Sequence, residues 1–416
     1  MTRMEQIDAD QSRLIEESLN KLQSYIEKEN YKGWDPYDAL SSPLFKFPFF
    51  RTNKFIRFAS QQVIKRAPIN LRPLLRIPKG YNPVTLGLML QGYCYLIKNE
   101  KLKITKDTSP LDLSQGDLLN ATEKKIEFLI NELDRLQSKG FSGACWGYDF
   151  DWEARYANIP AFTPTVVATG FITNALFICY NITGNHKAKE LLISSANFVL
   201  TDLHRTYSEN HHPSSLIHNP FCFSYSPSDK QIVYNASMKG VRILSQVYSI
   251  TKETRLIETA KNAVEFVIKD QNEDGSWYYS KTDAGKWIDN YHSGYILDCL
   301  DEYRKHTDDK SYDENIKCGY EFYINNFFEE GGAPKFYYNR KYPIDCTAAA
   351  QSILTLTRFG NEKMAKKVAG YMIKNMQDMQ GYYFRDYGSK KEKTSFMRWS
   401  NAWMFAALTY LLNSLD

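Results

Sequence analysis

Six apolar segments recur along the chain, and they limit the folds that it can adopt. Each is rich in small residues and poor in charge. They lie at about 84–98, 165–181, 233–249, 290–304, 345–359 and 399–413. A helix that is apolar around most of its circumference has to be buried on most sides. The segments therefore predict six helices that line the inside of one structure.

Amphipathic segments with charged faces lie between the apolar ones, and they predict helices on the outside. They are found at about 120–138, 187–203, 253–270, 312–328 and 361–378. A sixth outer helix would come from 10–28 or from 55–66, and the pattern does not choose between the two. We therefore predict an all-α fold, an (α/α)6 toroid of six helical hairpins at 83–416, preceded by a helical, basic segment at 1–82.

The connection after each outer segment is also repeated. It places glycine before aromatic residues, as in Gly275 before Trp277 and Gly381 before Tyr382. We expect the glycine to end the helix in the left-handed conformation and the aromatic run to form a short extended segment. Because each connection leads into an inner helix, these loops should gather at one end of the ring, where a site is expected.

The positive charge is concentrated near the beginning of the chain. No acidic residue occurs from Ala39 to Asn99, where cations alternate with phenylalanines. This composition predicts a peripheral contact of 46–79 with an anionic membrane, and a solvated basic face is the alternative. Nucleic acid is not an expected partner, because no nucleic-acid-binding motif accompanies the charge.

The remaining composition favours a cytoplasmic protein, with peripheral contact to the inner membrane as a further expectation. The first residues form a polar amphipathic pattern, and we expect no secretion signal and no transmembrane span. The seven cysteines are widely spaced without a C-x-x-C pair, which predicts reduced and mostly buried thiols. No metal and no cofactor are expected, since no metal-binding motif, phosphate-binding loop or dinucleotide-binding loop occurs.

Residues 271–277 resemble the Q-x-x-x-G-x-W motif of squalene and hopene cyclases, and the hairpin repeat resembles that superfamily of toroids over about 120–416. In this motif the glutamine caps a helix and the tryptophan packs against it. The aspartate-rich signature of terpene cyclases does not occur on an inner segment. Terpenoid cyclisation is therefore the least favoured hypothesis.

The opening W-D-P-Y-D at 34–38 and the finish R-W-S-N-A-W at 398–403 resemble toroid proteins of bacterial surface-polysaccharide gene clusters. Related toroids of six-hairpin-glycosidase-like architecture include uronate lyases, glycoside hydrolases and uronyl epimerases. The resemblance implies a carbohydrate-active protein of surface polysaccharide, capsule or exopolysaccharide biosynthesis. Its partner would be a poly- or oligosaccharide, free or lipid-linked.

Polar and aromatic residues stand at or near the starts of the later inner segments, where one mouth of the ring would collect them. The candidates for catalysis are Tyr291, His292, Asp345 and Arg398, and those for substrate binding are Asn235, Trp287, Trp399 and Asn401. His292 leads because Asp289 and Tyr291 could orient an imidazole that exchanges protons near neutral pH. A histidine that only caps the helix is the alternative.

The loop at 146–156 carries the densest group of aromatic and acidic residues. Asp149 is a candidate acid or base for glycoside hydrolysis, with the distant Asp345 as its partner. The loop's candidates for sugar binding are Trp146, Tyr148, Asp151 and Trp152. A structural loop, with aspartates that hold turns, is the alternative.

Three reactions remain open at this stage. Hydrolysis would use the carboxylates, whereas elimination or epimerisation of a uronate would use Tyr291 or His292 as base and Asn235 or Arg398 to neutralise the carboxylate. The sequence thus predicts a glycan-modifying hydrolase, lyase or epimerase. The alternative is a non-catalytic glycan-binding or scaffold protein of polysaccharide assembly.

Overall fold

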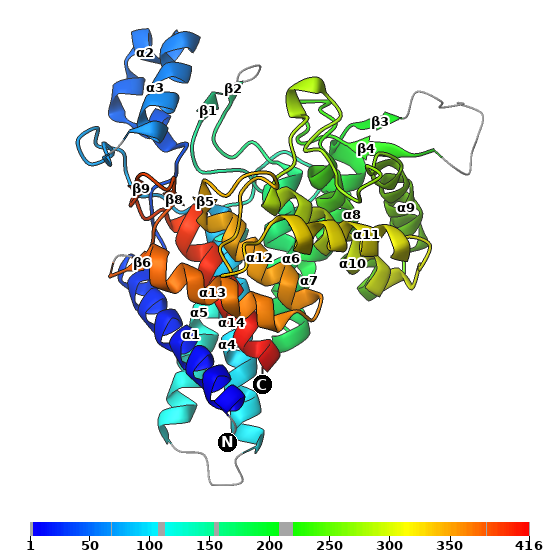
Figure 1. Cartoon of the computed structure of the whole chain (residues 1–416). Helices are drawn as coiled ribbons and strands as arrows, with labels where there is room; N and C mark the ends of the chain where they lie inside the picture. Colours follow the sequence, from blue (N-terminus) through cyan, green and yellow to red (C-terminus); the bar gives the residue numbers. More distant parts are fainter. Residues whose placement is uncertain are drawn as a thin grey trace.

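Six inner helices form a closed ring in the computed structural model, which describes residues 3–67, 69–106, 113–153, 158–207, 219–379 and 381–415. They are α4 (Pro83–Lys106), α6 (Val166–Thr183), α8 (Tyr234–Thr251), α10 (Asn290–Thr307), α12 (Cys346–Arg358) and α14 (Trp403–Leu415). Each contacts the next, and α14 contacts α4 (Figure 1). The predicted (α/α)6 toroid is confirmed.

Outer helices cover the ring. They are α1 (Arg3–Lys28), α5 (Leu113–Arg135), α7 (His186–Asn197), α9 (Thr254–Lys269), α11 (Asp313–Asn326) and α13 (Glu362–Met376). Helix α1 packs against α13 and α14 and so completes the outer layer. The sixth outer helix is therefore the candidate segment at 10–28. Helix α3 (Lys54–Arg66) instead projects with α2 (Pro48–Thr52) from one end of the ring (Figure 1).

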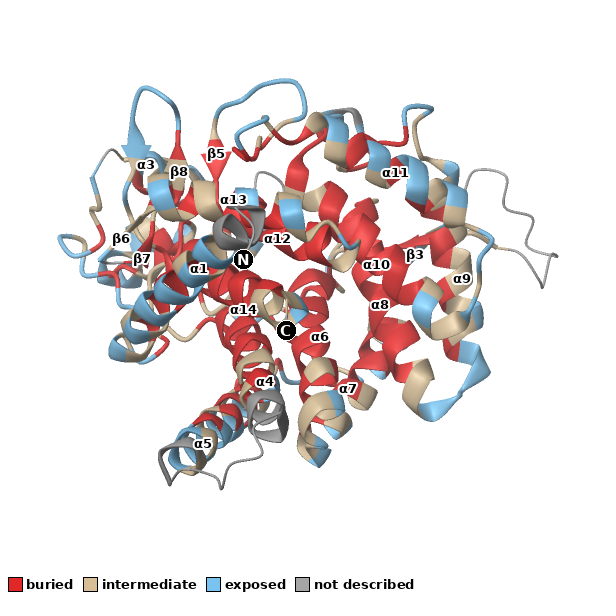
Figure 2. Cartoon of the chain, turned by 60° about the horizontal axis from the view of Figure 1, so that its bottom comes forward, coloured by how far each residue is buried: buried red, intermediate tan, exposed pale blue. Residues whose placement is uncertain are grey.

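The buried residues are concentrated on the inner helices, as Figure 2 shows. Glycine allows these helices to approach closely. A Cβ atom on Gly92 of α4 would clash with the ring of Phe405 on α14. The contact that closes the ring therefore requires the smallest side chain at this position.

Helix α6 combines length with a strongly apolar sequence. By length and composition it is the one helix among the described residues that is apolar enough to cross a membrane. However, 67% of it is buried, and it lies between α4 and α8 in the ring. Its apolarity is that of a core helix.

Short strands and turns lie in the connections. The antiparallel pairs are β1 (Trp152–Glu153) with β2 (Asn158–Ile159), β3 (Arg205–Tyr207) with β4 (Phe221–Phe223), and β6 (Gln377–Asp378) with β7 (Gly381–Tyr382); β5 (Ile344–Asp345), β8 (Arg385–Asp386) and β9 (Lys391–Glu392) form one sheet. The 3-10 turns are η1 (Asp38–Ser41), η2 (Pro43–Lys46) and η4 (Asp283–Gly285), and the π turns are η3 (Phe198–Asp202) and η5 (Met397–Ala402). Most of these segments gather at the end of the ring from which α2 and α3 project (Figure 1).

The Gln271–Trp277 motif is structural. Gln271 Nε2 donates to the carbonyls of Gly275 and Asn315, and Trp277 Nε1 donates to the Val267 carbonyl. These bonds tie the end of α9 to α11. The expectation that glycine ends the outer helix was wrong here, because α9 ends at Lys269, and Gly275, with φ +88°, turns the chain six residues later.

Candidate functional site

A cavity of about 400 Å³ lies at the mouth of the ring, at the N-terminal ends of inner helices. Helices α6, α8 and α10 contribute Val167, Asn235 and His292 to its wall. Loop aromatics such as Tyr148 and Tyr279 also line it. The volume lies within the range of pockets that hold small organic ligands.

His292 is held by a carboxylate behind it. Asp289 caps α10: its Oδ1 accepts the His292 backbone N–H at 3.0 Å, and its Oδ2 lies 2.7 Å from His292 Nδ1. The same Oδ2 accepts the Trp287 indole N–H at 2.9 Å. Because a carboxylate only accepts, Nδ1 carries the proton and Nε2 is the nitrogen left for a ligand. The Asp289 side chain is 1% exposed and that of His292 is 19% exposed, so only the imidazole faces the cavity.

The tyrosines of the cavity are hydrogen-bond donors. Burial, followed by the charge of Asp289, raises the pKa of Tyr291, Tyr295 and Tyr279 above the ordinary range, and burial also raises the pKa of Tyr225. These phenols stay protonated at neutral pH. Tyr291, predicted as an alternative base, therefore has the protonation state of a donor. His292 Nε2, whose ring partner Nδ1 donates to Asp289, is the acceptor nitrogen in this wall.

Two buried donors in the cavity wall have no partner among the described residues. They are Asn235 Nδ2 and Trp399 Nε1. An unpaired buried N–H costs free energy unless a ligand or water accepts from it. Both residues line the cavity, so these N–H groups lie beside it without a protein partner among the described residues.

Arg398 lines the cavity, but its charge is already paired. Its Nε and Nη2 donate to the two Asp35 carboxylate oxygens at 2.6 and 2.9 Å, and both side chains are buried. The guanidinium also lies over the rings of Tyr148 and Trp399, at 4.5 and 4.7 Å. The opening and finishing motifs of the chain meet in this ion pair.

Aromatic side chains form the walls and floor of the cavity. Trp287 stacks on Tyr279 with 4.5 Å between the ring centroids. Trp152 lies edge-on to Tyr37, whose hydroxyl accepts a hydrogen bond from Lys65 at 2.6 Å. Such surfaces suit the apolar faces of sugar rings as well as other flat apolar ligands.

The structure brings eight of the predicted site residues together around this cavity. They are Tyr148, Trp152, Asn235, Trp287, Tyr291, His292, Arg398 and Trp399. Trp146 and Asn401 lie elsewhere. Trp146 is buried and donates to the Leu133 carbonyl, as Trp277 does to Val267. Asn401 is buried and accepts from the Tyr382 backbone N–H.

The predicted carboxylates lie outside the cavity lining. Asp345 caps α12 and bonds Arg385 at 2.6 Å, and Asp151 accepts the Ala161 N–H and holds its loop. Asp149 accepts from Asn82 and lines a separate space of about 70 Å³; burial, and then the charge of Asp35, raises its pKa to about 6. The Asp149–Asp345 pair therefore gains no support as a hydrolytic pair. Residues 154–156, the rest of this predicted sugar-binding loop, lie outside the described residues.

Sequence reasoning missed the floor of the cavity, which consists of Phe171, Tyr295 and Trp403. A signal for two of these residues was present. Tyr295 and Trp403 follow Tyr291 and Trp399 by four positions, so they continue the same helix face one turn deeper.

The described part of the chain contains no candidate metal site. No group of three or more histidine, cysteine or acidic side chains there could hold a metal ion. The seven cysteines are free thiols, and all but Cys318 are buried.

No family model matches the chain, and no curated protein matches its sequence significantly. Solved structures of sugar enzymes do match its fold. A cellobiose 2-epimerase from Bacillus thermoamylovorans B4167 matches with a TM-score of 0.58 and 11% identity, over 82% of this chain and 90% of that one. A GH76 α-mannanase from Bacteroides thetaiotaomicron matches with a TM-score of 0.52 and 14% identity, over 80% and 85%. A variant of an unsaturated glucuronyl hydrolase from Streptococcus agalactiae matches with a TM-score of 0.52 and 12% identity, over 97% and 91%. The chain thus shares its toroid fold with sugar epimerases and glycoside hydrolases.

Proposed function

We propose that the protein is a carbohydrate-active enzyme in which His292 exchanges a proton with a sugar bound at the ring mouth. The observation that carries this proposal is the Asp289–His292 pair, which leaves Nε2 as the free nitrogen in the wall of the cavity. An imidazole oriented in this way serves as a general base or acid near neutral pH. The solved structures with a similar fold include a cellobiose 2-epimerase, which supports a sugar as the ligand.

The lining favours proton abstraction over hydrolysis. Among the described residues, no aspartate or glutamate lines the cavity. Glycoside hydrolysis usually needs two accessible carboxylates that flank the scissile bond. Removal of a proton from a carbon next to a carbonyl needs one base and a group that stabilises the enolate oxygen, and His292 with Asn235 or Trp399 supplies this set.

The charge of the cavity favours a neutral sugar. Arg398 would be the partner of a uronate, but Asp35 already neutralises it. Hydroxyl and carbonyl oxygens of a neutral sugar suit the unpaired N–H groups of Asn235 and Trp399. We therefore favour epimerisation of a neutral sugar over elimination or epimerisation of a uronate.

Incubation with reducing disaccharides and oligosaccharides in deuterated water tests the proposal. The expected result is deuterium gain at a sugar carbon, without cleavage, detected by NMR and mass spectrometry. His292→Gln should lower the exchange rate about a hundredfold. His186→Gln, at an exposed histidine of α7, is the matched control and should keep the wild-type rate.

Other outcomes would replace the proposal with a named alternative. Addition of water with cleavage would indicate a hydrolase, and cleavage without water a lyase. Sugar that binds to the wild-type protein without any exchange would indicate the non-catalytic binding or scaffold role.

A surface-polysaccharide pathway, a lipid-linked substrate, a cytoplasmic location and a peripheral membrane contact through 46–79 belong to the same proposal. Support for the membrane contact comes from Phe47, Phe49 and Phe55, which are 61%, 68% and 77% exposed on the projecting α2–α3 segment. Arg57 does not belong to the contact, because it is buried and paired with Glu153 at 2.8 Å.

Vesicle sedimentation tests this contact. Vesicles that contain anionic lipid should bind the protein, high salt should release it, and Arg51→Glu with Lys54→Glu should abolish binding. Unchanged sedimentation of this double variant would discard the membrane contact and leave the sugar chemistry untouched.

A further inference from the structure

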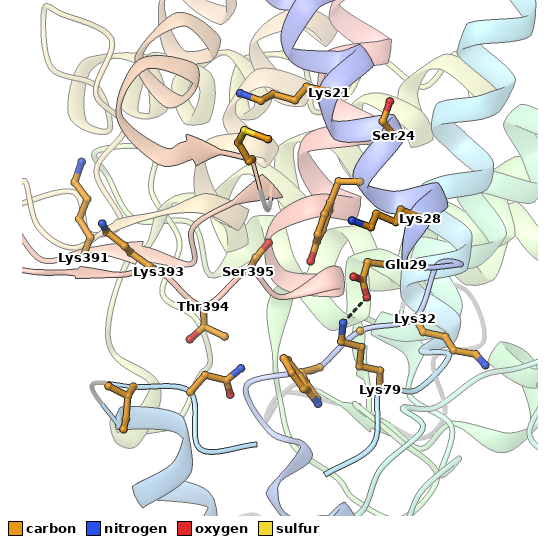
Figure 3. A pocket seen from close by; sticks show the side chains of 16 residues that line it. Lys21, Ser24, Lys28, Glu29, Lys32, Lys79, Lys391, Lys393, Thr394 and Ser395 are labelled. Carbon is orange, nitrogen blue, oxygen red and sulfur yellow. Dashed lines mark hydrogen bonds and ion pairs between the residues drawn. The ribbon is translucent and has the colours of Figure 1, made fainter. Parts of the chain in front are cut away.

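A second and larger cavity, of about 880 Å³, lies on the side of the ring and shares no lining residue with the mouth cavity. Its walls come from the second half of α1, from 32–34, from 69–70 and Lys79, and from 391–395. Figure 3 shows Lys21 and Lys28 of α1 on one side of the space and Lys391 and Lys393 on another. Segments far apart in the sequence thus build one concave surface.

Lysines dominate the charge of this cavity. Its lining holds Lys21, Lys28, Lys32, Lys79, Lys391 and Lys393. Glu29 is the one acidic residue among the described lining residues, and it forms an ion pair with Lys79 (Figure 3). The other cations repel one another across a concave space that focuses their field.

The partners of these lysines leave part of the charge unneutralised. Lys391 Nζ donates to the Asn375 carbonyl and lies 3.9 Å from Asp386 Oδ2, and Lys32 lies over the Tyr81 ring. Lys21 and Lys28 make no ion pair within the described ranges, and Lys393 has the Tyr383 ring as its neighbour there, at 5.6 Å. A bound anion would relieve the repulsion among these groups.

The remaining lining combines one hydroxyl donor with an apolar wall. Ser24, Thr394 and Ser395 all line the cavity (Figure 3). The Ser24 hydroxyl already donates to the Asn20 carbonyl at 2.9 Å, and Ser395 Oγ accepts from Asn401 Nδ2 at 2.8 Å, so Thr394 supplies the hydroxyl for a ligand. Ile69 and Met379, which are 68% and 83% exposed, supply apolar surface at its edge. A single carboxylate would use little of this charge, whereas each phosphate group offers up to two charges and several acceptor oxygens.

We infer that the lysine cavity binds a ligand that carries a diphosphate group on an organic moiety. Lysines and the Thr394 hydroxyl hold the phosphates, and Ile69 and Met379 contact the organic part. This chemistry is shared by soluble nucleoside diphosphates and by lipid diphosphates. The site is separate from the proposed sugar chemistry of His292, and either can fail without the other.

Calorimetric titration with inorganic pyrophosphate, at fixed ionic strength, tests the site on the full chain. The wild-type protein should bind with a Kd below about 1 mM, and bound pyrophosphate should raise the melting temperature. Lys28→Gln with Lys393→Gln should raise the Kd about tenfold or more, because it removes a charged contact from each of two walls.

The matched control removes the same charge elsewhere. Lys310→Gln with Lys317→Gln changes two exposed lysines near α11, at 72% and 63% side-chain exposure, and should leave the Kd unchanged. His292→Gln should also bind pyrophosphate like the wild-type protein, which separates this test from that of the mouth chemistry.

Two further titrations distinguish the sources of the diphosphate. A nucleoside diphosphate that binds more tightly than pyrophosphate, through the lysine cavity, would assign a soluble ligand. Binding to vesicles doped with a polyprenyl diphosphate, lost in the Lys28 and Lys393 variant but kept in the control, would assign a lipid. No pyrophosphate binding at about 1 mM, or an equal loss in both double variants, would overturn the inference and leave a solvated basic face.

Discussion

The two halves of the ring interior are lined by the same inner helices but are built from different chemistry. A layer of Phe171, Tyr295 and Trp403 separates them, with ring centroids 4.9 to 5.8 Å apart. The half at the mouth is an aromatic cavity with His292 and two unpaired donors. The half below is packed with charged side chains and leaves a space of only about 30 Å³.

In the lower half, carboxylates surround the side chain of Arg358. Arg358 Nη1 bonds Glu302 at 2.5 Å and Asp301 at 3.1 Å. Asp298 accepts from Gln351 and Thr355. Although burial alone would raise it, Arg358 and His306 hold the pKa of Glu302 well below its usual range.

The difference shows how to separate structural from functional polar groups in one fold. Buried polar groups whose hydrogen bonds and ion pairs are complete fix the packing of helices. Removal of one partner from such a group lowers the stability of the protein. Polar groups that keep a donor or acceptor without a protein partner are the ones that can form hydrogen bonds to a ligand. His292, Asn235 and Trp399 belong to the second kind.

The largest expected effect concerns the charged half. Arg358→Met should lower the free energy of unfolding by about 3–5 kcal/mol, because Glu302, Asp301 and Asp298 lose their shared cation. Urea unfolding measures this loss. Arg304→Met, at a half-exposed arginine that pairs with Asp301, should cost about 1 kcal/mol or less. Equal losses in the two variants would show that the deeper burial of Arg358 adds nothing to the cost of losing its ion pairs.

The next effect concerns the mouth. Asp289→Asn keeps an N-cap for α10, but it removes the carboxylate that orients the imidazole. The proposed proton exchange should fall about a hundredfold, which corresponds to about 2.7 kcal/mol. Initial rates in deuterated water report it, together with a melting curve to show that the fold is kept. A wild-type rate in a folded Asp289→Asn protein would contradict the role of the pair.

A smaller effect is expected for the unpaired donors. Trp399→Phe removes an N–H that has no protein partner, so it should weaken sugar binding about tenfold without loss of stability. Trp146→Phe is the converse control, because it removes the bond to the Leu133 carbonyl and should lower stability while sugar binding is kept. Titration calorimetry and thermal unfolding distinguish them. Loss of stability in Trp399→Phe would mean that its N–H is paired in solution.

The smallest effect lies under the aromatic layer. Lys239 is buried against Phe171 and Tyr295; burial, and then Arg242, lowers its pKa to about 7. An unfolded lysine titrates near pH 10.4, so between about pH 7 and 10 the unfolded chain binds more protons and stability should rise with pH.

Lys239→Met removes this slope. The free energy of unfolding of the variant minus that of the wild-type protein should therefore be larger at pH 6 than at pH 9. Urea unfolding of both proteins at the two pH values measures the difference. A difference that does not shrink with pH would show that Lys239 keeps its proton in the folded state.

The fold could be predicted because its signal is local. Apolar and amphipathic periods alone separate inner from outer helices, and residues near the helix starts, such as Asn235 and His292, reach the mouth as expected. Pairings between distant residues could not be predicted. Asp35 and Arg398, which meet in one ion pair, are 363 positions apart. Trp146 was predicted to bind sugar because a structural tryptophan after an outer helix has the same kind of sequence neighbours as a sugar-binding tryptophan.

Helix α1 seals the ring against the last hairpin, where Ser18 Oγ contacts Gln377 Oε1 and the Tyr382 hydroxyl. During synthesis at about 5–20 residues per second, α1 leaves the ribosome on the order of tens of seconds before these partners exist. Its apolar stripe of Ile15, Leu19, Leu22 and Ile26, buried in the finished ring, lacks the surface of α13 and α14 throughout that interval. The ring can close only after nearly the whole chain has emerged, so chaperone protection of α1 would matter most during translation.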